Sequence, residues 1–349
     1  MFKKFQETLS FDDVLLVPIY SEIVSRKEVL LQTNLSLKRK FILDIPIFSA
    51  AMDTVTESKM AIALGKMGGI GIIHRFITTE KQVVEVKKSK SAGVRVGAAV
   101  GVKNGEMERA KALVNAGVDL LVLDIAHGHS KYGLEKTKLL RKMFPKTFII
   151  AGTVATGKGF LDLARAGADA VRVGIGAGSI CTTRIVTGFG VPQISAILDC
   201  LSASKKTGVG LISDGGIKNS GDIVKALAAG ACAIMTGNIL AGTDEAPGKL
   251  ITYQGKKFKV YRGMASLQAN LSRFDKKNNK NEIIAEGVSG AVPYKGSVVD
   301  VIKKTIGGIR SGLSYAGAKD IKTFQKKASF IRITPSGFRE SNFHDIFVK

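Results

Sequence analysis

Short runs of apolar residues recur along the chain, and a polar, helix-like stretch follows most of them. Uninterrupted apolar runs of this length are typical of parallel strands that are buried on both faces. The pattern predicts eight strands, at residues 45–53, 69–75, 94–100, 120–128, 148–154, 170–176, 210–216 and 233–238.

Several segments between these runs carry apolar residues at a spacing of three to four and then reach a glycine, as amphipathic helices do. They are residues 57–68, 105–117, 159–168 and 220–231. Eight strand–helix units in series predict an α/β fold, a closed (β/α)8 TIM barrel, with an open doubly wound sheet as the alternative. The active site of such a barrel lies at the C-terminal ends of its strands.

Two segments break the repeat. Residues 242 to about 296 are irregular and polar, so we expect a mobile flap inserted at about 243–296. The tail, residues 330–349, is also irregular. We therefore predict one catalytic barrel domain spanning residues 1–349, with a flap and a tail.

Composition adds a strong positive charge. The 349 residues carry a formal charge of +23, which suits polyanionic partners, but no nucleic-acid-binding motif accompanies it. A solvated lysine-rich surface is therefore the favoured interpretation, and phosphate-bearing small molecules remain attractive ligands. Three scattered cysteines, no signal peptide and no long apolar segment predict a cytoplasmic protein without a membrane span.

The densest chemical pattern is GIGAGSICTTR, residues 174–184, directly after the sixth predicted strand. Its glycines allow backbone amides to approach an anion, and Ser179 adds a hydroxyl donor. Cys181 lies where barrel enzymes place reactive groups, and a neighbouring anion-binding turn would favour its thiolate. A small buried cysteine in a glycine-rich turn is an equally good interpretation.

Two further glycine-rich turns, residues 213–222 and 236–242, follow the next two strands, where barrels commonly bind phosphate. Asp214 could accept hydrogen bonds from ribose hydroxyls, or could simply shape its turn. Asp124, His127 and His129 lack a further ligand at metal-binding spacing, so a catalytic metal is disfavoured there. No dinucleotide-binding GxGxxG pattern is present, so a nicotinamide cofactor would bind across the barrel mouth.

Five segments together resemble the IMP dehydrogenase / GMP reductase family. They are FSAAMDTVTES, GIGAGSICTTRIVTGFGVPQ, SDGGIKNSGDIVKALAAGA, YRGMASL and EGVSGAVPYKG. The resemblance extends from about Leu9 to His344 and implies a homotetrameric barrel that acts at purine C2 of a nucleoside 5'-monophosphate, GMP or IMP. It also implies NADPH or NAD as cofactor and a monovalent cation, K+.

The resemblance assigns roles to individual residues. Cys181 would form a covalent thioimidate with C2, Thr183 and Glu286 would relay protons in a reductase, and Arg273 would be the base in a dehydrogenase. The implied substrate contacts are Met52, Ser179, Asp214, Gly216, Gly237, Asn238, Tyr261, Gly263, Met264 and Ala265. The implied cofactor contacts are Asp124, Thr153 and Gly174. The implied cation ligands are Gly176, Gly178 and Cys181, with Glu340, Ser341 and Asn342 from a neighbouring subunit.

The direction of the reaction depends on finer features. Dehydrogenases of the family resemble one another in an Arg-Tyr pair on the flap, where this chain has Arg273 and Phe274. The usual regulatory CBS modules are missing before Val94, Ile125 replaces a serine, and SRKEV and IIHRF resemble reductases. In contrast, IVTGFGVPQ and GFRESNFHD resemble bacterial dehydrogenases. We predict GMP reductase, with IMP dehydrogenase as the alternative and a non-catalytic nucleotide or nucleic-acid binder as a distant third.

Overall fold

Eight parallel strands close into a barrel. The computed structural model describes residues 5–272 and 284–342. The strands are β4 Ile47–Ser49, β5 Ile70–Ile73, β6 Val96–Val100, β7 Leu120–Asp124, β8 Phe148–Val154, β9 Ala170–Val173, β10 Gly210–Asp214 and β11 Ala233–Thr236. Each pairs with its neighbour in chain order, and β11 pairs back with β4 to close the ring. The predicted TIM barrel is confirmed, and the alternative of an open sheet is wrong.

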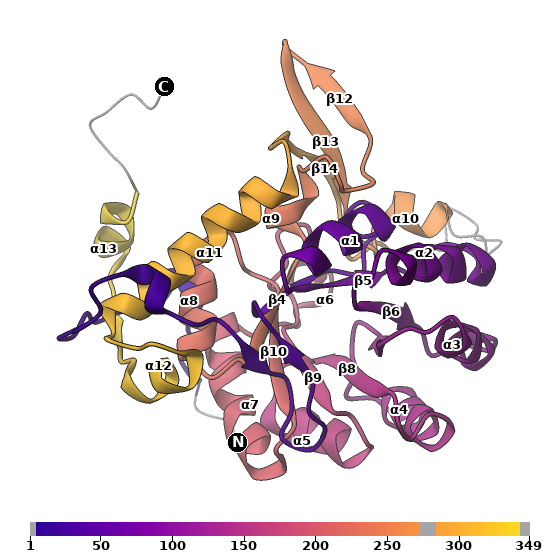
Figure 1. Cartoon of the computed structure of the whole chain (residues 1–349), viewed down its shortest axis with the longest axis horizontal. Coiled ribbons are helices and arrows are strands. Elements are labelled where there is room, and N and C mark those ends of the chain that lie inside the picture. Colours follow the sequence, from indigo (N-terminus) through magenta and orange to yellow (C-terminus); the bar gives the residue numbers. More distant parts are fainter. Residues whose placement is uncertain (1–4, 273–283, 343–349) are drawn as a thin grey trace.

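Helices surround the barrel (Figure 1). They are α1 Ser58–Lys66, α2 Thr79–Ser91, α3 Glu106–Asn115, α4 Lys131–Met143, α5 Gly157–Arg165, α7 Gln193–Thr207, α8 Ser220–Ala228 and α11 Val298–Tyr315. Side-chain oxygens at the first positions of several helices accept backbone N–H groups, for example Thr78 from Lys81 and Asn219 from Asp222. The four helices expected from sequence correspond to α1, α3, α5 and α8. None of the described helices is both long and apolar enough to cross a membrane.

Successive residues of each barrel strand pack into two different apolar cores. Phe48, Ile72, Val122 and Ile150 pack in the barrel interior, whereas their sequence neighbours, such as Leu121, pack outward against the helices. This two-residue alternation explains the apolar runs, because both faces of each strand are buried. It also determines which residues point inward at the strand ends, where the site forms.

The segment expected to be irregular contains regular structure, so that expectation is wrong for its described part. Strands β12 Leu250–Tyr253, β13 Lys256–Arg262 and β14 Ser289–Pro293 form an antiparallel sheet, and α10 Leu267–Leu271 is a short helix. Another short helix, α9 Asn238–Ala241, directly precedes the segment. The sheet is fixed to the barrel because Arg262 Nε donates to both carboxylate oxygens of Asp53, at 3.2 and 3.0 Å. β12 and β14 are mostly exposed, so they lack the buried apolar run that identifies the barrel strands in the sequence.

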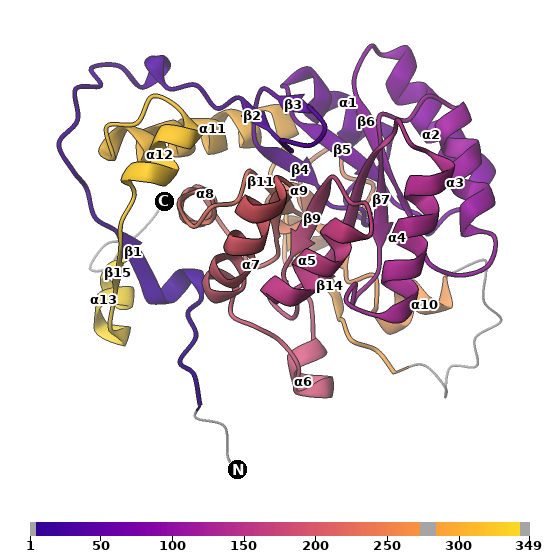
Figure 2. The same cartoon turned by 90° about the horizontal axis from the view of Figure 1, so that it is seen from below.

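The tail also contains regular elements, contrary to expectation. Strand β15 Phe330–Arg332 pairs antiparallel with β1 Val14–Leu16, and the two lie side by side in Figure 2, followed by α13 Pro335–Glu340. Such a partner from the other end of the chain has no local sequence signal. The remaining elements are η1 Phe11–Asp13, η2 Arg26–Glu28, β2 Thr33–Asn34, β3 Ile42–Leu43, α6 Thr183–Thr187 and α12 Ile321–Lys327.

Candidate active site

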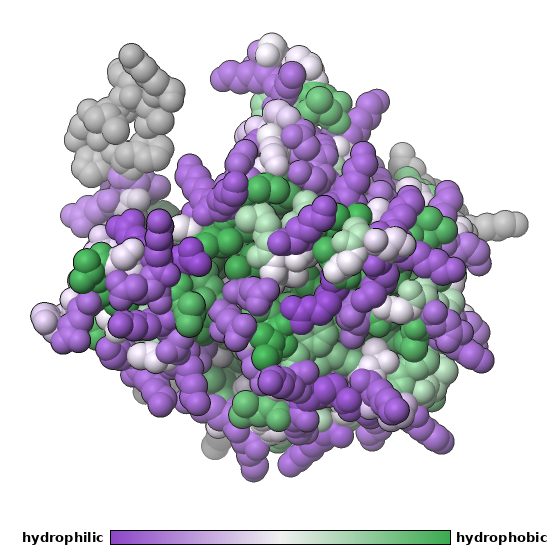
Figure 3. Space-filling view, viewed as in Figure 1, coloured by the Kyte–Doolittle hydropathy of each residue, from purple (hydrophilic) through white to green (hydrophobic). Residues whose placement is uncertain are grey.

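A large pocket opens at the carboxyl ends of the barrel strands. It has a volume of about 1280 Å³ and is lined by the turns that follow β7 to β11 together with residues 261–265 and 284–286. This position is where barrel enzymes bind substrates. The face of the molecule in Figure 3 carries many hydrophilic side chains, as expected for a chain with a charge of +23, with hydrophobic patches between them.

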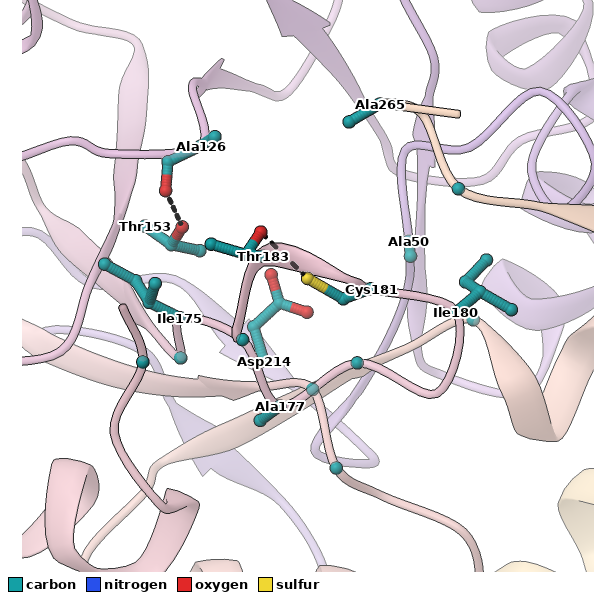
Figure 4. Close-up of a pocket in the computed structure, with 18 of the residues that line it drawn as sticks. Ala50, Ala126, Thr153, Ile175, Ala177, Ile180, Cys181, Thr183, Asp214 and Ala265 are labelled. Carbon is teal, nitrogen blue, oxygen red and sulfur yellow. Dashed lines mark hydrogen bonds between the residues drawn. The ribbon is translucent and has the colours of Figure 1, made fainter. Parts of the chain in front are cut away.

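A hydrogen-bonded chain of three side chains crosses the pocket. The Cys181 thiol donates to the Thr183 hydroxyl at 3.2 Å, as Figure 4 shows, and that hydroxyl donates to Glu286 Oε2 at 2.8 Å. A thiol, a hydroxyl and a carboxylate in this order can move a proton away from sulfur. The geometry therefore fits a nucleophilic cysteine better than an inert buried one.

Backbone bonds hold the two halves of this chain together. The Thr182 N–H donates to the Glu286 carbonyl at 3.0 Å, and the Val288 N–H donates to the Ile180 carbonyl at 3.0 Å. These two bonds flank a bridge between Cys181 and Gly287. The glycine-rich loop after β9 and the segment before β14 thus form a two-stranded ribbon, which positions the carboxylate of one strand beside the hydroxyl of the other.

A cradle of small and polar residues lies beside the thiol. Asn238 Nδ2 is 3.4 Å from Ser179 Oγ, and Tyr261 is buried with only 5% of its surface exposed. Burial raises the pKa of Tyr261 to about 12, against a smaller opposing effect of its hydrogen bond with Ser179, so its hydroxyl remains a hydrogen-bond donor. Gly237 permits the close approach, because a Cβ there would lie 2.7 Å from the Tyr261 hydroxyl. Hydroxyl and amide donors in a glycine-rich setting suit a phosphate.

Two carboxylates on the pocket floor share one arginine. Arg172 donates to Asp214 Oδ2 from Nε at 2.8 Å and from Nη2 at 2.7 Å, and Nη1 donates to Asp124 Oδ1 at 2.9 Å. Arg75 adds a second cation 3.4 Å from Asp124. Burial alone would raise the pKa of Asp124, but the charges of Arg172 and Arg75 outweigh it and hold that pKa below its usual value. Asp124 is therefore ionised and can accept hydrogen bonds from hydroxyl groups.

The structure places nearly all the predicted residues of the chain around this pocket. All the catalytic, substrate, cofactor and cation candidates named above line it, apart from four. Arg273 lies outside the described residues. Glu340, Ser341 and Asn342 end α13 or follow it, and they do not line the pocket.

Two arginines of the pocket floor, Arg172 and Arg75, were not predicted from the sequence. Arg172 is the one charged residue in the apolar run 170–176, and an isolated charge at an inward-facing strand position was the available signal. Arg75 ends the predicted strand 69–75, so its position at a carboxyl end was visible as well.

His127 and His129 both line the pocket, whereas the two remaining cysteines lie in structural positions. His129 Nε2 lies 3.0 Å from Asp162 Oδ2, and among the described residues no group of three or more His, Cys, Asp and Glu side chains could hold a metal ion. Cys200 is buried in α7, and Cys232 donates to the Leu211 carbonyl at 3.2 Å. Burial raises the pKa of both thiols, to about 12 for Cys232, so neither matches the environment of the pocket thiol.

A closed α/β barrel whose mouth holds a thiol, a hydroxyl and a carboxylate in one hydrogen-bonded series has the architecture of a barrel enzyme. Residues 8–344 match the IMP dehydrogenase / GMP reductase domain, so the chain belongs to that family and is an oxidoreductase of it. This family membership confirms the resemblance found in the sequence.

The relatives of the chain are mostly dehydrogenases. Inosine-5'-monophosphate dehydrogenase of Nitrosopumilus maritimus is 39% identical over 476 aligned positions, which cover 99% of this chain and 100% of the relative. The enzyme of the same name from Cryptosporidium parvum is 43% identical over 392 positions, covering 99% and 96%. GMP reductase of Leishmania donovani is 36% identical over 480 positions, covering 97% of each. Since the first and third alignments are much longer than 349 residues, those relatives contain internal segments that this chain lacks.

Proposed function

We propose that this protein is an IMP dehydrogenase, which oxidises C2 of IMP with NAD+ and water to give XMP, NADH and a proton. The observation that carries the catalytic assignment is the hydrogen-bonded chain from Cys181 through Thr183 to Glu286. The direction rests on the relatives, most of which are named dehydrogenases and match over nearly their whole length. The sequence features alone had favoured the reductase.

The first half-reaction uses the thiol as a nucleophile. Its proton passes to the Thr183 hydroxyl, whose own proton moves to Glu286, while sulfur bonds to C2 and the C2–N3 π pair moves to N3. NAD+ supplies the acceptor for the hydride that leaves C2, and N3 returns its electron pair to restore the C2=N3 bond. The product of this half-reaction is a thioimidate on Cys181.

The second half-reaction is hydrolysis. Glu286 first releases its proton to solvent. Water then adds to C2, the C2–N3 π pair moves to N3, and one water proton passes through Thr183 to Glu286. The C2–S bond breaks as the new C2–OH becomes C2=O, the hydroxyl proton goes to N3, and Glu286 returns its proton through Thr183 to the leaving sulfur, which restores the Cys181 thiol. Arg273, the base that the resemblance implies for a dehydrogenase, lies outside the described residues. The relay supplies a base from the described part of the pocket, so the missing tyrosine at Phe274 does not by itself prevent hydrolysis.

The pocket has separate places for the two nucleotides. Ser179, Gly216, Gly237, Asn238 and Tyr261 would hold the substrate phosphate, and Asp214 would accept its ribose hydroxyls. Met52, Gly263, Met264 and Ala265 would contact the base. Ionised Asp124, with Thr153 and Gly174, would hold the nicotinamide ribose, which fits the donor and acceptor groups present there.

A bound K+ fits the loop after β9 in chemical type, because backbone carbonyls of Gly176, Gly178 and Cys181 are hard oxygen donors. The Gly178 carbonyl already accepts the Cys181 N–H at 3.1 Å, so this loop is partly preformed. Glu340 to Asn342 lie away from the pocket of their own chain, which supports our proposal that a neighbouring subunit of a homotetramer completes the cation site.

GMP reductase is the second candidate. In that reaction GMP, NADPH and two protons give IMP, NADP+ and ammonium, and Thr183 with Glu286 would protonate the departing ammonia. Phe274 and Ile125 in place of the tyrosine and serine of dehydrogenases support this reading, as does the similarity to the Leishmania enzyme.

A paired absorbance assay of reduced nicotinamide separates the candidates. Purified protein is given IMP with NAD+ in one cuvette and GMP with NADPH in another, both with potassium. We expect absorbance to rise in the first, and a fall confined to the second would establish the reductase instead. Cys181→Ala should abolish turnover, whereas the control Cys200→Ala, far from the chemistry in α7, should retain it. Turnover by Cys181→Ala would contradict the covalent mechanism.

A further inference from the structure

The buried floor of the pocket joins the two nucleotide sites through one side chain. Asp124, Arg172 and Asp214 occupy the inward-facing positions that continue the alternation of interior residues Val122, Ala170 and Ile212. They lie toward the carboxyl end of the barrel interior, where Arg172 bonds to both aspartates. The linked group therefore extends from β7, on the proposed cofactor side, to β10, on the proposed substrate side.

Arg172 reaches across β8 because β8 leaves room for it. The residue of β8 that pairs with Asp124 is Gly152, and a Cβ built there would lie 2.8 Å from Arg172 Cβ. Only 9% of the surface of Arg172 is exposed, so its guanidinium cannot reorient far without breaking one of its ion pairs. The guanidinium donates to Asp214 through Nε and Nη2, and its third nitrogen, Nη1, donates to Asp124.

We propose that Arg172 is a positioning residue that couples the substrate and cofactor sites, so that each nucleotide binds more tightly when the other is bound. The inference rests on the proposed function, which assigns Asp214 to the substrate ribose and Asp124 to the cofactor ribose. When a ribose fixes Asp214, the guanidinium bound to it is fixed too, and Asp124 is already ordered for the second nucleotide. Coupling is reciprocal, and we expect a factor of about 5, the lower end of the usual range.

Arg75 provides the matched control. It is also an arginine on the pocket floor, but the salt bridge it makes there is with Asp124, at 3.4 Å, and not with Asp214. Arg75→Lys should weaken cofactor binding and leave the coupling factor unchanged. Arg172→Lys keeps the positive charge but replaces the planar fork by a point charge that cannot hold both carboxylates in this geometry.

The test measures binding without turnover. In a Cys181→Ala background, isothermal titration gives the Kd of IMP alone and in saturating NAD+, and the ratio of the two is the coupling factor. We expect a ratio of about 5 in this background, a ratio near one when Arg172→Lys is added, and the parental ratio when Arg75→Lys is added. Asp124→Asn, which removes the negative charge from the same link, should also lower the ratio toward one and serves if the arginine variant does not fold.

The outcomes separate the two proposals. A ratio near one in the Cys181→Ala background, or an unchanged ratio in both Arg172→Lys and Asp124→Asn, overturns the coupling while the proposed function stands. Failure of IMP and NAD+ to bind to the well-folded Cys181→Ala protein overturns the proposed function instead. If Arg172 had a merely structural role, Arg172→Lys would weaken the binding of both nucleotides and lower the melting temperature. The coupling factor, the ratio of the two IMP Kd values, would then stay unchanged.

Discussion

Replacing Thr183 by valine tests the proton relay most directly. Valine has nearly the same shape but no hydroxyl, so the Cys181 thiol loses an acceptor at 3.2 Å and Glu286 loses a donor at 2.8 Å. Positioned acid–base groups contribute about 10²- to 10⁴-fold to rates. We take the lower end, about a 10²-fold fall in kcat, which corresponds to ~2.7 kcal/mol of activation free energy. The loss of hydrogen bonding should cost folding only about 1 kcal/mol.

The assay compares kcat, KM and melting temperature across three variants. Thr183→Ser restores the hydroxyl and should recover most of the rate. Thr182→Val makes the same chemical change one residue earlier, at a side chain that does not line the pocket, and should stay near the parental rate. If Thr183→Val keeps kcat within about threefold of the parent, far short of the 10²-fold expected of a relay, the relay has no catalytic role. An equal loss in Thr182→Val would assign the effect to the loop rather than to the hydroxyl.

Two other predictions concern the cradle and the thiols. Gly237→Ala should raise KM for the nucleotide about tenfold (~1.4 kcal/mol), because its Cβ would lie 2.7 Å from the Tyr261 hydroxyl; Gly307→Ala, with open space around it, should leave KM unchanged. An unchanged KM in both variants would refute the close contact. At pH 8, iodoacetamide should modify Cys181 and not Cys232, because burial raises the pKa of Cys232 to about 12 and keeps it a thiol. Mass spectrometry that finds Cys232 alkylated in folded protein would contradict this.

The barrel was predictable because its signal is local. Each strand buries both faces, so an apolar run identifies it without knowledge of its partner, and eight such runs imply closure. The glycine-rich turns were predictable for the same reason, since the carboxyl ends of all eight strands of a barrel lie at one rim. The sequence alone therefore places Cys181 and Asp214 at the same rim, where both line the pocket.

Elements held by distant or exposed contacts were not predictable. β12 and β14 are mostly exposed, so no buried apolar run marks them, and β14 pairs with β13 across residues 263–288. The pairing of β15 with β1 joins opposite ends of the chain. Arg172 was missed for a different reason. Its place in the site depends on ion pairs with residues of two other strands, β7 and β10, and no spacing in the sequence encodes that geometry.

The position of Glu286 shows how the fold converts a distant residue into part of the site. Its carboxylate meets Thr183 across 103 positions of sequence, and the approach is fixed by backbone bonds from Thr182 to Glu286 and from Val288 to Ile180. The same ribbon also holds Cys181, so the nucleophile and its proton acceptor are oriented by one piece of structure rather than by the substrate. The entropy of that alignment is therefore lost during folding and not during catalysis, which is the condition under which orientation lowers a barrier. Because one strand of the ribbon follows β9 and the other leads into β14, the relay joins the barrel to the antiparallel sheet beside it.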